Sequence, residues 1–192
     1  MRGLIISNPR VEFLRPALER WFDCIDRYSQ VMGEGECTHW FDERTNLGVL
    51  SNAAWMADMV TLEHAPSKKQ QDDGDRSART GLFIATSEDN AYIQATQRWP
   101  TFGEINLTPA LLDIVGDAKK TSYANHLKLG CLFVTPRKTL QSATHEELED
   151  FVDDLQKQNA CAIAWYFPYG YRKLHNEDGQ YFPGLALLLR TA

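Results

Sequence analysis

The chain has 192 residues, of which 43% are hydrophobic and 24% charged, and a formal net charge of −6. This length suits one α/β domain with a buried core, and no apolar run approaches the roughly 20 residues that span a bilayer. The negative charge argues against a large basic surface for nucleic acid, and the N-terminus lacks the apolar core of a signal peptide. We therefore expect a single soluble domain over residues 1–192, located in the cytoplasm.

The first half of the chain begins with two predicted helices. Apolar side chains recur at helical spacing over residues 10–32, and a second apolar stripe predicts a helix from about residue 41 to 58. Glu43 lies four residues before Leu47, so it belongs on the buried face of that second helix. The apolar stretch before residue 66 predicts a strand, and the polar segment 67–78 predicts a mobile loop.

The second half alternates between predicted strands and helices. Two short strands surround the turn at 87–90, and a helix follows with Thr108 as its N-cap and Pro109 as its first residue. Thr144 and Glu147 form a capping box that opens another helix. Further strands are expected at 130–134, 161–167 and 185–189. This order predicts an α/β fold, with a mixed central β-sheet flanked by helices.

One segment carries a family resemblance. An acid on the helix before a three-strand meander is the layout of a restriction-endonuclease-like core, where carboxylates hold Mg²⁺ and a lysine assists the attacking water. The stretch His39–Asn46, followed by Leu50 and residues 53–55, resembles an uncharacterised bacterial family with the motif W-Y-N-E-R-x-N and then L-A-x-A-A-W. Members of that family continue with G-R-x-D-L and E-A-K, the pattern of a PD-(D/E)xK nuclease-like site. The resemblance covers roughly residues 37–99 and implies a restriction-endonuclease-like sandwich.

The positions that match this pattern have lost most of its chemistry. Glu43 matches the helix acid, but Gly81 takes the place of the aspartate, and Gln94 and Thr96 replace the glutamate and the lysine. Glycine offers no ligand, glutamine is a weaker magnesium ligand than a carboxylate, and threonine carries no positive charge. We therefore expect vestigial positions without metal, cofactor or catalysis. The alternative is a migrated metal site that uses neighbouring acids, namely Asp72, Asp73, Asp75, Glu88 or Asp89.

Other reactive residues point to no site. Cys37 and His39 suggest a nucleophile pair, but their closeness along the chain supplies neither the oxyanion donor nor the geometry. No CxxC, HxxxH or HExxH spacing is present, so a zinc site is disfavoured. The cysteines are expected to be reduced and mostly buried, and the tryptophans to be core or core-edge residues; these are Cys24, Cys37, Cys131, Cys161, Trp21, Trp40, Trp55, Trp99 and Trp165.

The C-terminal segment is dense in residues that dominate protein interfaces. Its candidate binding residues are Trp165, Tyr166, Tyr169, Tyr171, Arg172, Tyr181 and Phe182. The alternative is a hairpin that packs its rings across its own sheet. The acidic helix at 145–158 is expected to be a solvated face.

These observations predict a noncatalytic protein that binds another protein on a degenerate nuclease-like fold. One class that fits is a regulator that sequesters a transcription factor, such as an antiactivator of a quorum-sensing receptor. Two alternatives stay open: a divergent Mg²⁺-dependent nuclease, and an immunity or antidefence protein that mimics nucleic acid. The mimic would act through the helix acids Glu146, Glu147, Asp150 and Asp153.

Overall fold

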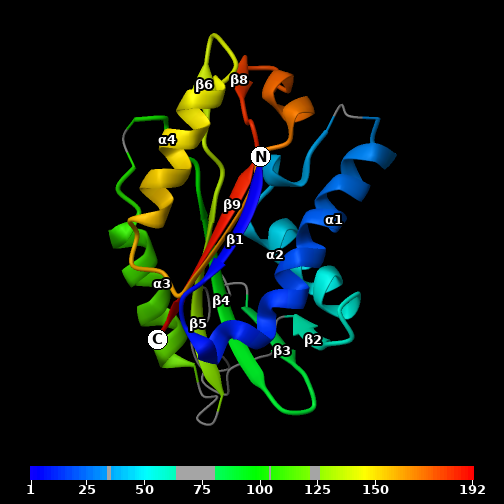
Figure 1. Cartoon of the computed structure of the whole chain (residues 1–192), viewed down its shortest axis with the longest axis vertical. Coiled ribbons are helices and arrows are strands. Elements are labelled where there is room, and N and C mark those ends of the chain that lie inside the picture. Colours follow the sequence, from blue (N-terminus) through cyan, green and yellow to red (C-terminus); the bar gives the residue numbers. More distant parts are fainter. Residues whose placement is uncertain (34–35, 64–80, 104, 122–125) are drawn as a thin grey trace, which may run out of the picture.

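The computed structural model describes residues 1–33, 36–63, 81–103, 105–121 and 126–192 (Figure 1). Seven strands form one sheet: β1 (Arg2–Ile6), β2 (Val60–Glu63), β3 (Gly81–Ala85), β4 (Asn90–Arg98), β5 (Leu127–Val134), β7 (Ala162–Tyr166) and β9 (Leu185–Thr191). Their order across the sheet is β1-β7-β9-β5-β4-β3-β2. The β4–β5 pair is parallel and the other pairs are antiparallel, so the sheet is mixed, as predicted.

Helices cover both faces of this sheet. They are α1 (Arg15–Val31), α2 (Glu43–Trp55), α3 (Thr108–Lys120) and α4 (His145–Gln156). Figure 1 shows α1 and α2 on one side of the sheet and α3 and α4 on the other. The predicted α/β fold class, a mixed sheet flanked by helices, is therefore confirmed. The finer likeness to a restriction endonuclease stays an expectation.

Short elements complete the fold. The 3-10 helices η1 (Pro9–Leu14), η2 (Thr38–Trp40) and η3 (Tyr169–Lys173) lie between the longer elements, and β6 (Lys138–Thr139) pairs with β8 (Gln180–Tyr181) in a separate two-stranded sheet. Figure 1 places β6 and β8 together at one end of the molecule.

Successive side chains of β4 point alternately toward the two halves of the core. Ile93 and Ala95 join the apolar cluster beneath α1 and α2. Gln97 also points to that side, since it bonds to Asn46 of α2. Successive side chains of a strand point to opposite faces, so Gln94 and the residues two before and two after it face the α3 side.

Two of the predicted helix starts differ in outcome. The capping box of α4 is confirmed: the Glu147 N–H donates to Thr144 Oγ1 at 3.2 Å, and the Thr144 N–H donates to Glu147 Oε2 at 2.8 Å. The prediction that Thr108 caps α3 is wrong by one residue. Leu107 is the N-cap and supplies no side-chain bond, while Pro109 lies in the first turn, where its missing N–H costs nothing.

Several expectations from the sequence need correction. The chain starts with a strand, β1, in a stretch that carried no strand prediction. Trp55 and Trp99 are exposed rather than core residues, at 56% and 37%. Three of the four free cysteines are buried as expected, and Cys24 is half-buried. The expected mobile loop at 67–78 lies outside the described residues.

Candidate binding surface

The four positions that match the nuclease pattern do not lie together on one face of the sheet. Gly81 and Gln94 are direct cross-strand partners in β3 and β4, and Thr96 lies two residues further on the same face of β4. That face is the one turned toward α3. Glu43 is the first residue of α2, which packs against the opposite face. The structure therefore groups Gly81, Gln94 and Thr96 and leaves the helix acid on the other side of the sheet.

The packing around Gly81 explains why a glycine stands there. A Cβ atom at Gly81 would lie 2.1 Å from the hydroxyl of Tyr92, which is far inside van der Waals contact. The same hydroxyl donates a hydrogen bond to Gln94 Oε1 at 3.3 Å. On the next position of this face, Thr96 Oγ1 accepts from a guanidinium nitrogen of Arg98 at 3.3 Å. An aspartate at position 81 would have to displace the Tyr92 ring.

The acids of the proposed migrated site are not near these positions. Glu88 and Asp89 are exposed in the turn that joins β3 to β4. Gly81 and Gln94 pair at the far end of that hairpin, about 13 Å away along a strand that rises about 3.3 Å per residue. Asp72, Asp73 and Asp75 lie outside the described residues. Within the described ranges, no three His, Cys, Asp or Glu side chains are grouped so as to hold a metal ion.

The Cys37–His39 pair exists but is not poised for nucleophilic attack. Cys37 Sγ lies 3.2 Å from His39 Nε2, and the same nitrogen lies 3.0 Å from the carbonyl oxygen of Phe182. A carbonyl oxygen only accepts, so Nε2 carries the proton and cannot serve as a base for the thiol. Burial lowers the pKa of His39 to about 4 and raises the pKa of Cys37 well above its usual range. Both groups are therefore neutral near pH 7, and the pair is structural.

The segment that resembles the bacterial family also has a structural role. Asp42 is the N-cap of α2, because its side chain accepts from the N–H groups of Arg44 and Thr45. Asn46 Nδ2 donates to Gln97 Oε1 at 2.8 Å, and both side chains are buried. These bonds fix the start of α2 and tie the helix to β4.

Three of the predicted binding residues are buried. Tyr166 packs its ring against Phe22 of α1, and its hydroxyl donates to Asp26. Tyr171 packs against His39 and donates to the carbonyl of Ile25 at 3.3 Å. Phe182 is also buried and contacts the Trp40 ring. These rings pack into the core, so they are not available as contacts on an outer surface.

The other predicted binding residues reach the surface. Tyr169 is 75% exposed, and the guanidinium of Arg172 lies 5.5 Å from the centre of its ring. Tyr181 is half-buried beside the His175 ring. Trp165 is half-buried on the opposite side from Tyr166, where its indole covers Gly3; a Cβ at Gly3 would lie 2.1 Å from that ring. Arg172 also approaches His145 Nδ1 of α4 at 3.1 Å.

A further surface residue was missed from the sequence. Leu140, directly after β6, is 94% exposed and has a φ angle of 73°. A branched side chain rarely adopts this left-handed region, which costs about 1–2 kcal/mol per residue. The one available signal was a single leucine within the polar run from Arg137 to Ser142.

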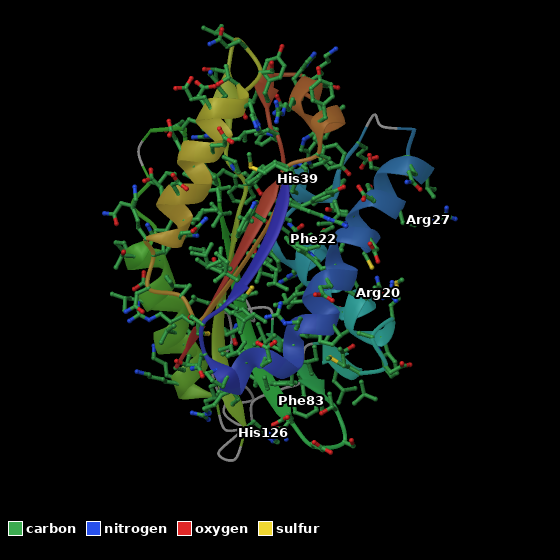
Figure 2. All side chains as sticks on the ribbon, viewed as in Figure 1. Arg20, Phe22, Arg27, His39, Phe83 and His126 are labelled. Carbon is green, nitrogen blue, oxygen red and sulfur yellow. The ribbon has the colours of Figure 1, made fainter. Side chains whose placement is uncertain are left out.

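Four of these residues belong to elements at one end of the molecule, and we call them together the end surface: Leu140, Tyr169, Arg172 and Tyr181. Leu140 follows β6, Tyr181 belongs to β8, and Figure 1 places both strands at the same end as the orange segment that holds η3. Figure 2 shows His39 buried at this end of the sheet, beneath η3. The buried rings thus anchor the segment from which the exposed ones project.

The acids of α4 form a separate, solvated face. Glu146, Glu149, Asp150 and Asp153 are exposed. Glu147 instead pairs with Lys138 of β6, which lowers the pKa of its carboxyl group. The solvated face expected from the sequence is therefore what the structure contains.

Comparisons with models of protein families, with curated proteins and with solved structures found no match. In the part of the chain that the structure describes, no helix is both long enough and apolar enough to cross a membrane.

Proposed function

We propose that this chain is a noncatalytic cytoplasmic regulator that binds another protein through its end surface. The observation that carries this proposal is Leu140, whose side chain is almost fully exposed on strained backbone. The left-handed φ opposes folding, and local backbone strain of this kind gathers at ligand contacts and switches. Burial of the side chain in a partner would offset this cost.

The composition of the end surface supports a protein partner. Tyrosine and arginine are over-represented among the residues that dominate binding energy, and they act from the centre of an interface. Tyr169 and Arg172 already stack on each other, so their side chains lose little freedom on binding. A fitting partner would offer an apolar pocket for Leu140 and a carboxylate for the Arg172 guanidinium.

The chemistry of the nuclease-like positions supports a role without catalysis. Gly81, Gln94 and Thr96 supply no carboxylate. Gln94 Oε1 accepts a hydrogen bond from Tyr92 and Thr96 Oγ1 accepts one from Arg98, so both oxygens already have partners within the protein. Sequestration of a transcription factor, as in an antiactivator of a quorum-sensing receptor, is the class of regulation we propose. The scaffold would then present a surface instead of a metal site.

Affinity capture with matched variants tests the proposal. The tagged wild-type chain, Leu140→Ser/Tyr169→Ser and the control Leu112→Ser, which changes a leucine 48% exposed on α3, are incubated with nuclease-treated lysate of the source cells. A protein retained by the wild type and by Leu112→Ser, but not by the double variant, is the expected result. Retention that is equal in all three chains would contradict the proposal.

A nuclease assay tests the alternative that the chain is a divergent nuclease. The purified chain is expected to leave DNA and RNA intact with Mg²⁺ or Mn²⁺. Metal-dependent cleavage that is lost in Glu43→Gln would instead establish the divergent nuclease. Loss of partner binding when the exposed acids Glu146, Asp150 and Asp153 are neutralised, with Glu147 and the end surface unchanged, would favour the acidic mimic.

A further inference from the structure

One edge of β1 pairs with no strand among the residues that the structure describes. Met1 and Phe167 exchange two backbone hydrogen bonds of 2.9 and 2.8 Å, and the Ser7 N–H donates to the Cys161 carbonyl at 3.0 Å. In an antiparallel pair the backbone N–H and C=O groups of successive residues point alternately toward and away from the partner strand. The odd-numbered residues of β1 therefore bond to β7. The N–H and C=O groups of Arg2 and Leu4 therefore point away from the sheet. Since β1 is the outermost strand, these groups are an open edge.

This edge borders a cavity of about 740 Å³. The cavity is lined by Arg2, Gly3 and Leu4 of β1, by Pro16, Glu19, Arg20, Phe22 and Asp23 of α1, and by residues 56–58. Figure 2 shows Phe22 between α1 and β1, and Arg20 on the outer side of the helix. A chain that enters this cavity would meet two outward N–H groups and two outward carbonyls. An extended backbone, with its alternating donors and acceptors, is the ligand that matches them.

The charges along the cavity favour a basic segment. Three carboxylates line it, those of Glu19, Asp23 and Asp58, against the two guanidinium groups of Arg2 and Arg20. Arg20 is bonded to Asp23 at 3.1 Å, and the Arg2 guanidinium lies 5.8 Å from the centre of the Phe22 ring. Because Arg20 and Asp23 pair with each other, the remaining charges are the carboxylates of Glu19 and Asp58 against the guanidinium of Arg2, and the whole chain carries a net charge of −6. Lysine or arginine side chains on the added segment would complement this lining.

We propose that this groove, defined by β1, α1 and residues 56–58, binds an extended basic peptide segment that adds to β1 as an outer strand. This site goes beyond the end surface and shares no residue with it. Backbone bonds to Arg2 and Leu4 supply the register, and Glu19 and Asp58 supply the preference for positive side chains. A second recognition site would let one chain hold a flexible arm of a partner as well as a folded surface.

A titration with a defined peptide tests this site. The full ¹⁵N-labelled chain is titrated with blocked Lys-Val-Lys-Val-Lys-Val, and backbone amide shifts and hydrogen exchange are followed by NMR. Saturable shifts at Arg2 and Leu4 and on the facing side of α1, with slower exchange of the Arg2 and Leu4 amides, are expected. The matched variants are Arg2→Pro, which removes an outward N–H without breaking a bond to β7, and Arg2→Ala, which removes only the side chain. Binding should weaken about tenfold more in Arg2→Pro than in Arg2→Ala, as the loss of one well-formed backbone bond implies.

Two peptide controls do not depend on whether the proline variant folds. The same peptide with every backbone amide N-methylated should not bind, and a Glu-Val repeat should bind at least severalfold more weakly. Shifts confined to other elements, the absence of saturable shifts, or equal binding of the methylated or acidic peptide would overturn the proposal. Leu140→Ser should leave peptide binding unchanged, so that failure of this site and failure of the end surface are separate results.

Discussion

The side-chain amide of Asn46 donates to Gln97 Oε1 across 2.8 Å and joins α2 to β4 inside the core. Gln97 makes two further hydrogen bonds: its Nε2 donates to the carbonyl of His39 at 3.3 Å and to Thr135 Oγ1 at 3.1 Å. These side chains are almost fully buried. Buried polar side chains of α2 and β4 thus hold two layers of the fold together.

Replacement of Asn46 should therefore destabilise the protein. Asn46→Ala leaves the buried Gln97 Oε1 without its donor, which should lower the free energy of unfolding by about 1–3 kcal/mol. Urea denaturation measures the change. Asn52→Ala, at an exposed position of the same helix, is the control and should shift stability by less than about 0.5 kcal/mol. Equal effects of the two variants would show that the bond is dispensable.

Stability should fall in mild acid because of His39. Burial lowers its folded-state pKa to about 4, below the ordinary value of 6.5. Between pH 6.5 and pH 4 this histidine therefore binds a proton in the unfolded chain but not in the folded chain. The stabilisation is complete above pH 6.5 and is lost as the pH falls toward 4, by about 3 kcal/mol in all. Urea titrations at several pH values measure this slope.

The slope should be specific to that histidine. His39→Gln should flatten it, because the buried imidazole is then absent. A slope that persists in His39→Gln would assign the acid sensitivity to other groups.

Restoring the aspartate of the nuclease pattern should harm the fold without creating a metal site. Gly81→Asp forces a Cβ against the Tyr92 hydroxyl, and such overpacking should lower stability by about 1–3 kcal/mol. The variant should also fail to bind Mg²⁺ in calorimetry, since Glu43 lies on the other face of the sheet. The less bulky Tyr92→Ala background should relieve much of the added cost. Mg²⁺ binding by Gly81→Asp that Glu43→Gln abolishes would contradict the face assignment.

Leu140 should be dispensable for folding. Leu140→Gly relieves the left-handed φ and should raise the free energy of unfolding by about 1 kcal/mol, while binding to the captured partner is lost. Leu112→Gly, within helix α3, should lower stability by about 1 kcal/mol and keep the partner. Thermal and urea unfolding give the stabilities. A Leu140→Gly variant that is clearly less stable would indicate that the side chain serves the fold.

Local signals predicted much of this fold. The capping box at Thr144 and Glu147 fixed the start of α4, and the turn at 87–90 marked the β3–β4 hairpin, because both depend on neighbours in the chain. β1 was not predicted, because a strand of five residues shows little periodicity and its partner strand lies about 160 residues later. Strand pairing over that separation depends on the whole core.

The candidate site was harder to predict because burial is decided by distant partners. Tyr166, Tyr169 and Tyr171 are close in sequence and chemically alike, yet the first and last pack against α1 and only Tyr169 is exposed. Leu140 offered only the weak signal of one leucine in a polar run, since its exposure and backbone strain appear only in three dimensions. The composition of the segment predicted an interface, and the structure shows which of its aromatic residues are exposed.

Photocrosslinking from the end surface tests whether these residues contact a partner protein. A photoreactive phenylalanine analogue is placed at position 169 or 140, or at position 112 as the control, and the source cells are irradiated. A crosslink from positions 169 and 140 to the same protein, and none from position 112, is the expected result. Crosslinks that are absent from positions 169 and 140, equal at position 112, or formed only with nucleic acid would contradict it.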